Sequence, residues 1–280
     1  MKEGKFPLVL LFSFLLSACS SSFAYNNIDW LMYWYVDDYV DLSPSQKDML
    51  DERVALWQDW HRSIELQKYQ GQLKNLKIKL DSGPLNQDQW LREFDEAQEH
   101  LNRFRTKIAP ELAEVAQQLS LEQIEGALSA LDKKRQESLI KFEKQTVAER
   151  LKRREERLSE PVEDNMGKLS QLQTDIIKKY AHQFIPTFSE RTAYQRTLQN
   201  AAKDIFANRN APEFKQQLVS LIGDPDHYKT SEYEATLAYN TRLYAKMLAE
   251  LNLTFTQEQK LRLDAKLDEW VDLIDELISG

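Results

Sequence analysis

The residues of this chain that could carry out metal or acid–base chemistry are few and far apart. Its four histidines are His61, His100, His182 and His227. None belongs to a His-Glu-x-x-His sequence, and none follows a glutamate by three residues as helical di-iron sites require. Glu96 and His100 would share one face of a helix, where they could form half a metal site or a solvated hydrogen bond. We favour the hydrogen bond and expect no bound metal.

The sequence also lacks the common motifs of catalytic sites. It contains no nucleophile elbow, no phosphate-binding loop and no dinucleotide-binding fingerprint. Cys19 is the only cysteine, so its lipidation would leave the mature chain without a thiol nucleophile. We therefore expect a protein that is not an enzyme and needs no cofactor.

Cys19 follows a segment that is typical of an export signal. Lys2 and Lys5 form a short positive region, and residues 6–16 are mostly apolar. Because this run is too short to cross a bilayer as a helix, it predicts a cleaved signal peptide at residues 1–18. The ending "LSAC" resembles the lipobox of bacterial lipoproteins, in which the cysteine receives diacylglycerol and becomes the mature N-terminus.

Lipid attachment would explain why an exported chain keeps a single cysteine. One cysteine cannot form an intramolecular disulfide, so it needs another role. The alternative is a plain signal peptide or a buried helix in which the cysteine is incidental. The resemblance to enterobacterial lipoproteins, with Ser20 after the cysteine, implies sorting to the outer membrane, facing the periplasm. We expect residues 19–27 to form a lipidated tether and residues 28–280 to form the helical domain.

The composition favours a helical protein that does not bind nucleic acid. The net charge is −8, and 29% of the residues are charged. Such a chain is repelled by nucleic acid and by anionic lipids, so an acyl anchor would have to hold it at a membrane. Only 7 glycines and 8 prolines occur in 280 residues, which argues against β-rich or disordered architecture.

Apolar residues recur at three- and four-residue intervals along most of the chain, as amphipathic helices require. The longest such stretch, residues 119–158, predicts a helix of about 40 residues and 60 Å if it is unbroken. We therefore expect an all-α fold, an elongated bundle of long amphipathic helices joined by short turns. A division near Pro161 would give two lobes, residues 28–160 and 161–280. Turns are expected at residues 81–86, 109–111, 159–164, 184–189, 208–213 and 222–231.

A short motif recurs where helices are expected to begin. It reads "LSPSQ", "LNQDQ", "LSLEQ" and "FTQEQ", and its capping residues are Ser43, Asn86, Ser120 and Thr256. In such a capping box, the cap side chain accepts from a free backbone N–H, and the glutamine reaches back to the N–H of the cap residue. The motif is also similar to the Leu-Thr-x-x-Gln motif of Spy-like periplasmic chaperones, which are all-helical and independent of ATP.

The segment after the expected tether is unusually aromatic. Residues 28–40 read "IDWLMYWYVDDYV", which is apolar on almost every side of a helix and too short to span a bilayer. We favour a core helix with both tryptophans buried. The alternative is an interfacial helix with its rings at the level of lipid headgroups, although the aspartates count against deep membrane contact and would suit a partner's Arg or Lys. The candidate core or partner-binding residues are Trp30, Trp34, Asp37, Asp38 and Tyr39.

The stretch "AYNNIDWLMYWYVDDYVDLSPSQ", directly after the lipobox, resembles the signature of an uncharacterised family of proteobacterial lipoproteins with a domain of unknown function. The resemblance rests on the Tyr-Asn-x-x-Asp-Trp and Asp-Asp-Tyr elements. It implies an all-helical exported lipoprotein and brings no activity, cofactor or catalytic residue.

We favour a membrane-anchored, non-enzymatic periplasmic lipoprotein that acts as an interaction or envelope-assembly scaffold. The alternatives are a Spy-like holdase chaperone, and a hydrolase or lipid-binding protein. The expected partners are the membrane, through the N-terminal lipid, and an envelope protein; the oligomeric state is left open. A scaffold should present an apolar patch, a holdase a concave surface of mixed apolar and charged residues, and an enzyme a pocket with converging polar groups.

Overall fold

The structure, a computed structural model, describes residues 18–279, with side chains from Ser22 onward. The described residues are largely helical and form no β-strand, so the predicted all-α class is confirmed. The signal peptide predicted before Cys19, and the side chain of Cys19 itself, lie outside the described residues.

The helices are short at the N-terminus and longer along most of the remaining chain. Their bounds are α2 (Ala18–Asn26), α3 (Ile28–Val36), α4 (Pro44–Trp60), the π-helix η1 (His61–Glu65), α5 (Leu66–Ser82), α6 (Gln87–Gln117), α7 (Leu121–Glu143), α8 (Val147–Met166), α9 (Gln171–Ala181), α10 (Phe188–Ala207), α11 (Phe214–Gly223), the 3-10 helix η2 (Pro225–Tyr228), α12 (Ser231–Asn252) and α13 (Gln257–Ser279). No turn separates α4, η1 and α5, which follow one another directly.

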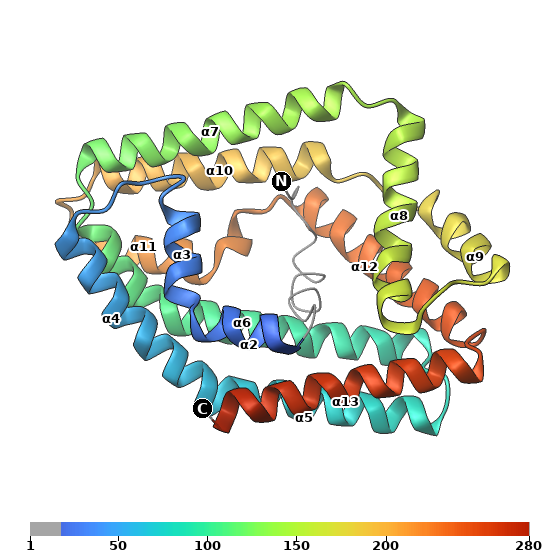
Figure 1. Cartoon of the computed structure of the whole chain (residues 1–280). Helices are drawn as coiled ribbons and strands as arrows, with labels where there is room; N and C mark the ends of the chain where they lie inside the picture. Colours follow the sequence, from blue (N-terminus) through green and yellow to red (C-terminus); the bar gives the residue numbers. More distant parts are fainter. Residues whose placement is uncertain (1–17, 280) are drawn as a thin grey trace.

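The long helices run along the sides of a frame (Figure 1). α7 and α10 lie together on one side, and α8 and α9 pack together at the adjacent side. α5 and α13 lie together on the side opposite α7, and α4 closes the frame. The short helices α2 and α3 lie within the outline of this frame (Figure 1).

The apolar core is divided among the sides of the frame. One cluster joins α5 to α13, a second joins α8, α9 and α12, a third joins α4 to α6, and a fourth joins α6, α10 and α11. Small side chains bring α6 and α11 close together, because Ala109 and Ala113 are buried and a Cβ at Gly223 would lie 3.4 Å from the Cβ of Ala109.

Two of the predicted turns are wrong because the prolines that suggested them lie inside helices. Pro110 lies within α6 and Pro161 within α8. A proline inside a helix removes one hydrogen bond, so tertiary packing has to compensate for it. Buried neighbours do so here: Ala109 and Ala113 beside the first proline, and Val162 beside the second.

The single helix expected over residues 119–158 is divided in two. α7 ends at Glu143 and α8 begins at Val147, so the helix is broken inside the run of mixed charge. The break is made by Thr146, whose backbone N–H donates to the Glu149 carboxylate over 2.7 Å while its hydroxyl accepts from the Glu149 N–H over 3.2 Å. This is a capping box with glutamate in place of glutamine, a variant that our search for glutamine missed.

Each of the four predicted capping motifs begins a helix with the reciprocal pair of hydrogen bonds. The boxes are Ser43 with Gln46, Asn86 with Gln89, Ser120 with Gln123, and Thr256 with Gln259. A further glutamine box, Ser170 with Gln173, begins α9 and comes from the sequence "LSQLQ". Helix initiation is therefore encoded locally at all five positions.

Two of these glutamines also bind each other at a corner of the frame, where α4 and α7 begin (Figure 1). Gln46 Nε2 lies 3.0 Å from Gln123 Oε1, and Gln123 Nε2 lies 2.8 Å from Gln46 Oε1. Each Nε2 also donates to a backbone carbonyl two residues before the other cap, that of Gln118 over 2.7 Å and that of Asp41 over 2.6 Å. Each amide thus uses both donor hydrogens and both acceptor sites of its oxygen, and the starts of α4 and α7 are joined.

The same arrangement joins the starts of α9 and α13. Gln173 and Gln259 exchange hydrogen bonds of 2.8 Å and 3.0 Å. Their Nε2 atoms donate over 3.2 Å to the carbonyls of Thr254 and Lys168, which again lie two residues before the opposite caps. Because both glutamines are buried, these bonds are made away from competing water. We call each arrangement a glutamine pair.

We predict that Gln173→Glu destabilises the protein by about 2–4 kcal/mol. A glutamate still accepts from the Ser170 N–H and keeps the cap, but it cannot donate to Thr254 and places a carboxylate beside the Gln259 oxygen. Urea unfolding at pH 7 measures the effect. The control is Gln89→Glu, which keeps the capping bond of Asn86 in a box that joins no second glutamine among the described contacts. Equal stability losses in both variants would show that the glutamine pair contributes nothing beyond capping.

Candidate functional site

The chain is helical from the region of Cys19 onward. α2 spans Ala18–Asn26, so the segment expected to be a tether contains about two and a half helical turns. Polar contacts hold α2 to the body: the Tyr25 hydroxyl lies 3.1 Å from Nδ1 of His61, and Ser22 donates to Glu276 over 3.1 Å. The residue expected to carry the lipid is therefore joined to the body by a short, docked helix.

α3 is not the core helix that we favoured. None of its residues is buried, and Trp30 and Trp34 are 60% and 72% exposed. The expectation that both tryptophans lie in the core is therefore wrong. A helix that is apolar on every side is usually buried, but α3 is covered on one side only.

One narrow face of α3 rests on the body. The Tyr33 hydroxyl on this face lies 3.0 Å from the Lys47 carbonyl oxygen and 2.6 Å from an Asp51 carboxylate oxygen. Met32 and Val36 are four residues apart and share the docked side of α3. Trp30 and Trp34, also four apart, share the opposite side and face solvent. The residues of α3 that pack against the cluster of α4 and α6 are Met32, Tyr33 and Val36.

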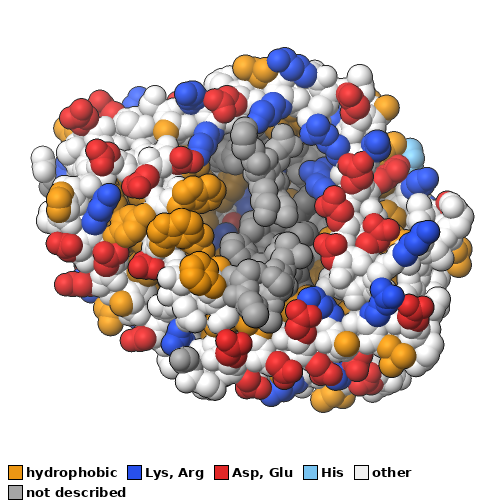
Figure 2. All heavy atoms as spheres, viewed as in Figure 1, with side chains coloured by type: hydrophobic (Ala, Val, Ile, Leu, Met, Phe, Trp, Pro, Cys, Tyr) orange, Lys and Arg blue, Asp and Glu red, His pale blue; other side chains and the backbone are white. Residues whose placement is uncertain are grey.

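The exposed apolar side chains of α2 and α3 form the clearest candidate site. We call them the aromatic patch, and they are Phe23, Ile28, Trp30, Trp34 and Tyr35. Figure 2 shows hydrophobic side chains gathered on the face of the molecule over α3. Other large exposed apolar residues are distributed over different helices, such as Val147 in α8 and Leu261 in α13. A contiguous exposed patch usually marks a surface that meets another molecule or a membrane.

The aspartates after α3 are engaged by lysines of the same chain. Lys134 of α7 lies 2.9 Å from Asp38, and Lys47 lies 3.9 Å from Asp37. The Lys134 ammonium also lies 4.1 Å from the ring centroid of Tyr39, and its hydrogen bond to Asp38 raises the pKa of this lysine. These contacts fix the segment after α3 against α4 and α7, which gives both aspartates a structural role within the chain.

A second cluster of polar residues surrounds the fully buried carboxylate of Glu65, at the end of the π-helix η1. Arg103 Nε lies 3.0 Å and 3.2 Å from its two oxygens, and Lys68 Nζ lies 2.7 Å from the first. His100, also buried, lies 3.5 Å from Glu65; its Nε2 is 3.0 Å from Gln72 Oε1, and its Nδ1 faces the Arg103 guanidinium. Neither Glu65 nor Arg103 was predicted as a site residue, because no sequence motif brings these residues together.

The environment of this cluster determines which groups are charged. Burial opposes ionisation of Glu65, but hydrogen bonds from Arg103 and Lys68 outweigh it and lower the pKa of Glu65 to about 2. Burial lowers the pKa of His61 to about 4 and also lowers the pKa of His100. At pH 7 the glutamate is therefore ionised and both imidazoles are neutral.

The cluster has the character of a structural junction. Glu65 accepts from two cations, and both ring nitrogens of His100 have protein partners, so these groups satisfy one another. Glu96, which we paired with His100, is exposed while His100 is buried. Among the described residues, no group of three or more His, Cys, Asp or Glu side chains could hold a metal ion.

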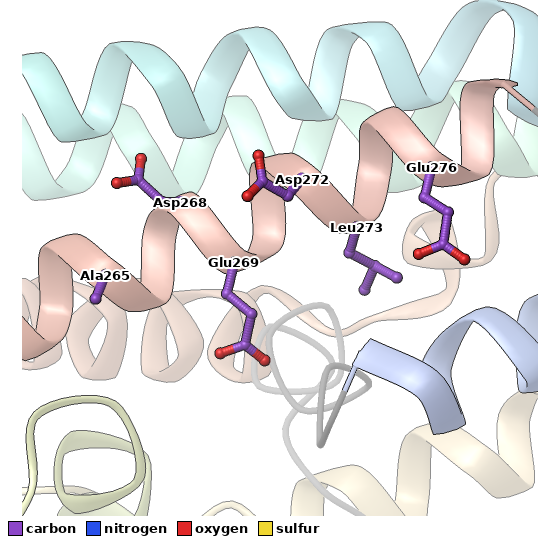
Figure 3. A pocket seen from close by; sticks show the side chains of 6 residues that line it. All are labelled: Ala265, Asp268, Glu269, Asp272, Leu273 and Glu276. Atoms are coloured by element: carbon purple, nitrogen blue, oxygen red, sulfur yellow. The ribbon is translucent and has the colours of Figure 1, made fainter.

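A third feature is an open concavity of about 500 Å³ along α13. Its lining mixes two apolar residues with four acids: Ala265, Asp268, Glu269, Asp272, Leu273 and Glu276. Figure 3 shows Glu269, Leu273 and Glu276 on one side of α13, and Asp268 and Asp272 on another. Lys77 of α5 contacts Asp268 and lies 3.2 Å from Asp264, so part of this acidic surface already has a cation.

Residues 38–234 match the model of a protein family described as "Family of unknown function (DUF6279)". The chain belongs to this family. The DUF6279 match contains Glu65, His100 and the first glutamine pair. It begins after α3 and ends within α12, so the aromatic patch and α13 lie beyond it.

No curated protein and no solved structure matches the chain. None of the described helices is both long and apolar enough to cross a membrane.

We predict that Trp34→Ala changes the free energy of unfolding by no more than about 0.5 kcal/mol, as expected for an exposed side chain. The matched variant is Trp57→Ala in α4, which should cost about 3–5 kcal/mol. Trp57 is 8% exposed, belongs to the cluster of α4 and α6, and contacts Glu111 through its indole N–H. Thermal or urea unfolding of both variants provides the measurement. A similar large loss for Trp34→Ala would mean that α3 is buried in solution.

We predict that lowering the pH from 7 to 5 destabilises the protein by about 2 kcal/mol through His61. Unfolded His61 takes up a proton near its ordinary pKa of 6.5, whereas the folded protein resists protonation until about pH 4. The stabilisation is present above pH 6.5 and is lost as the pH falls toward 4. Glu65 also stabilises the folded protein, because its pKa is lowered from 4.5 to about 2, and this stabilisation is lost as the pH falls through that range.

Urea unfolding at both pH values tests this sign and size. His61→Phe keeps an aromatic ring beside Tyr69 and Phe104 but removes the titrating group, so its stability should depend less on pH. An unchanged pH dependence in His61→Phe would exclude His61 as its source.

Proposed function

We propose that the protein is a lipid-anchored, non-enzymatic lipoprotein on the periplasmic face of the outer membrane, where it acts as an interaction or envelope-assembly scaffold. The aromatic patch supports this proposal best. Its residues belong to the segment that directly follows Cys19, and the body leaves Trp30 and Trp34 largely uncovered. A surface of this kind beside an anchor suits a protein that works by contact.

The buried polar cluster supports the same proposal in a different way. An enzyme needs polar groups that converge on a space open to substrate. Glu65 and His100 instead converge on each other and on Arg103, inside the junction of η1 with α6. Their contacts suit a role in holding the anchor helix, because His61 of the same π-helix contacts Tyr25 of α2.

The second candidate function is the Spy-like holdase, and the concavity along α13 favours it. A holdase binds unfolded chains weakly through a concave surface that mixes apolar and charged side chains. Among the residues that line the concavity, Ala265 is exposed beside the acids, whereas Leu273 is buried, so the accessible surface is chiefly acidic with a small apolar part. Its acidic character would select basic segments of client proteins.

We predict that Cys19→Ser abolishes labelling by a palmitate analogue and releases the protein from the membrane fraction, because one lipidated cysteine is the proposed anchor. Envelope proteins crosslinked to the native chain should be lost at the same time, since the variant no longer stays at the membrane. Metabolic labelling, fractionation and crosslinking of the same cells provide the readouts. Labelling that persists in Cys19→Ser would contradict the anchor.

The same crosslinking distinguishes the two candidate functions. A photo-crosslinker at position 269, in the concavity, should capture no more envelope protein than the control position if the protein is a scaffold that works through the aromatic patch. Capture of many unrelated chains, increasing under heat stress, would favour the holdase. The matched control is a crosslinker at position 253, an exposed leucine in the turn between α12 and α13.

A further inference from the structure

The aromatic patch has the composition of a membrane-interface surface. Trp30, Trp34 and Tyr35 combine large apolar rings with a polar N–H or O–H, and such residues concentrate at the level of lipid headgroups. Phe23 and Ile28 add apolar side chains without polar tips, and both are exposed. Because α3 has only nine residues, it can lie in the interface but cannot cross the bilayer.

The position of the patch along the chain brings it close to the lipid-bearing end. α2 has nine residues and is therefore about 13 Å long, and Phe23 lies about one turn, or 6 Å, from Cys19. α2 is docked on α13 and η1 through Ser22 and Tyr25, so it cannot swing freely as an extended tether would. A bilayer that holds an acyl chain on Cys19 would therefore lie close to Phe23, at the near end of the patch.

We propose that the aromatic patch inserts into the headgroup region of the bilayer that holds the anchor, and so sets the orientation of the body on the membrane. This inference rests on the proposed lipid anchor and names the surface that the patch contacts. Figure 2 shows hydrophobic side chains grouped over α3 on the face of the molecule that it draws.

Charge selects the kind of lipid. Asp37 and Asp38 adjoin the patch, and although Lys47 and Lys134 lie beside them, the chain as a whole carries a net charge of −8. An anionic surface would repel it, whereas a zwitterionic surface would accept the aromatic rings without that penalty. The expected partner is therefore a zwitterionic bilayer of the phosphatidylethanolamine or phosphatidylcholine type.

The test uses the full mature chain with Cys19→Ser, which carries no lipid, and vesicles of phosphatidylethanolamine and phosphatidylcholine. We expect this protein to bind the vesicles, and brominated lipid to quench part of its tryptophan fluorescence. The double variant Trp30→Ser/Trp34→Ser should bind at least about tenfold more weakly, because two aromatic side chains no longer leave water. Vesicles with added phosphatidylglycerol should bind the parent protein less well at low salt.

The matched control is Leu172→Ser/Leu253→Ser. These leucines are 60% and 72% exposed, as Trp30 and Trp34 are, but they lie at the start of α9 and in the turn after α12. The control should bind vesicles like the parent, and both double variants should keep the parent's unfolding temperature. Absence of vesicle binding by the parent, or equal binding by both double variants, would overturn the inference.

Two further outcomes separate this inference from the anchor and from a protein partner. If cells do not lipidate Cys19 but the unlipidated chain still binds vesicles through the patch, the anchor fails and the membrane contact stands. If a photo-crosslinker at position 34 captures a protein in the envelope instead of lipid, the patch is a protein-docking surface and the inference is wrong.

Discussion

The frame depends on one type of polar contact, the glutamine pair, which occurs twice. The pair of Gln46 and Gln123 is partly buried, and the pair of Gln173 and Gln259 is buried. In each pair, two capping residues begin two helices that are far apart in the sequence, and the amides behind them bind each other and the opposite backbone. Neither amide can rotate by half a turn without losing its bond to the cap residue. Each pair therefore fixes the first turn of one helix relative to the first turn of the other. Hydrogen bonds in this way join α4 to α7 at one corner of the frame and α9 to α13 at another.

The buried cluster around Glu65 has a comparable role at the junction between the body and its N-terminal segment. Gln58 donates to the Tyr25 carbonyl over 2.7 Å and Arg62 to Asn26 over 2.8 Å, so α2 is held by residues of α4 and η1. Behind them, Arg103 and Lys68 neutralise Glu65 and keep α5 and α6 in register. The π-helix η1 lies between α4, whose Gln58 donates to α2, and α5, which packs on α13. Because this junction holds α2 to the body, the proposed orientation of the N-terminal segment on the membrane would also fix the orientation of the body.

Local features of the sequence predicted the all-α class and four of the helix starts, because a capping box depends on four adjacent residues. The starts of α8 after Thr146 and of α9 after Ser170 were not predicted. The glutamine pairs could not be predicted from the sequence. The capping bond uses Oε1 of each glutamine, and the pair is formed by Nε2 with a residue more than 70 positions away. The turns predicted at Pro110 and Pro161 were wrong because the packing of buried neighbours compensates for the missing N–H groups of these prolines. The prediction that the aromatic segment is buried was wrong for a different reason. A helix that is apolar on every side is buried only when other helices surround it, and α3 packs against the body through one side only.

The glutamine pairs also bear on where the folding unit ends. The DUF6279 match stops at residue 234, but the second pair needs Gln259, and the cluster on α5 is completed by Leu267, Trp270 and Leu277 of α13. A fragment cut at the limits of the match would lack both residues to which Gln173 donates, which are Thr254 and Gln259, and would expose the leucine stripe of α5. The evolutionary unit that the family describes and the smallest fragment able to fold by itself are therefore different lengths of chain, and the second includes the last helix.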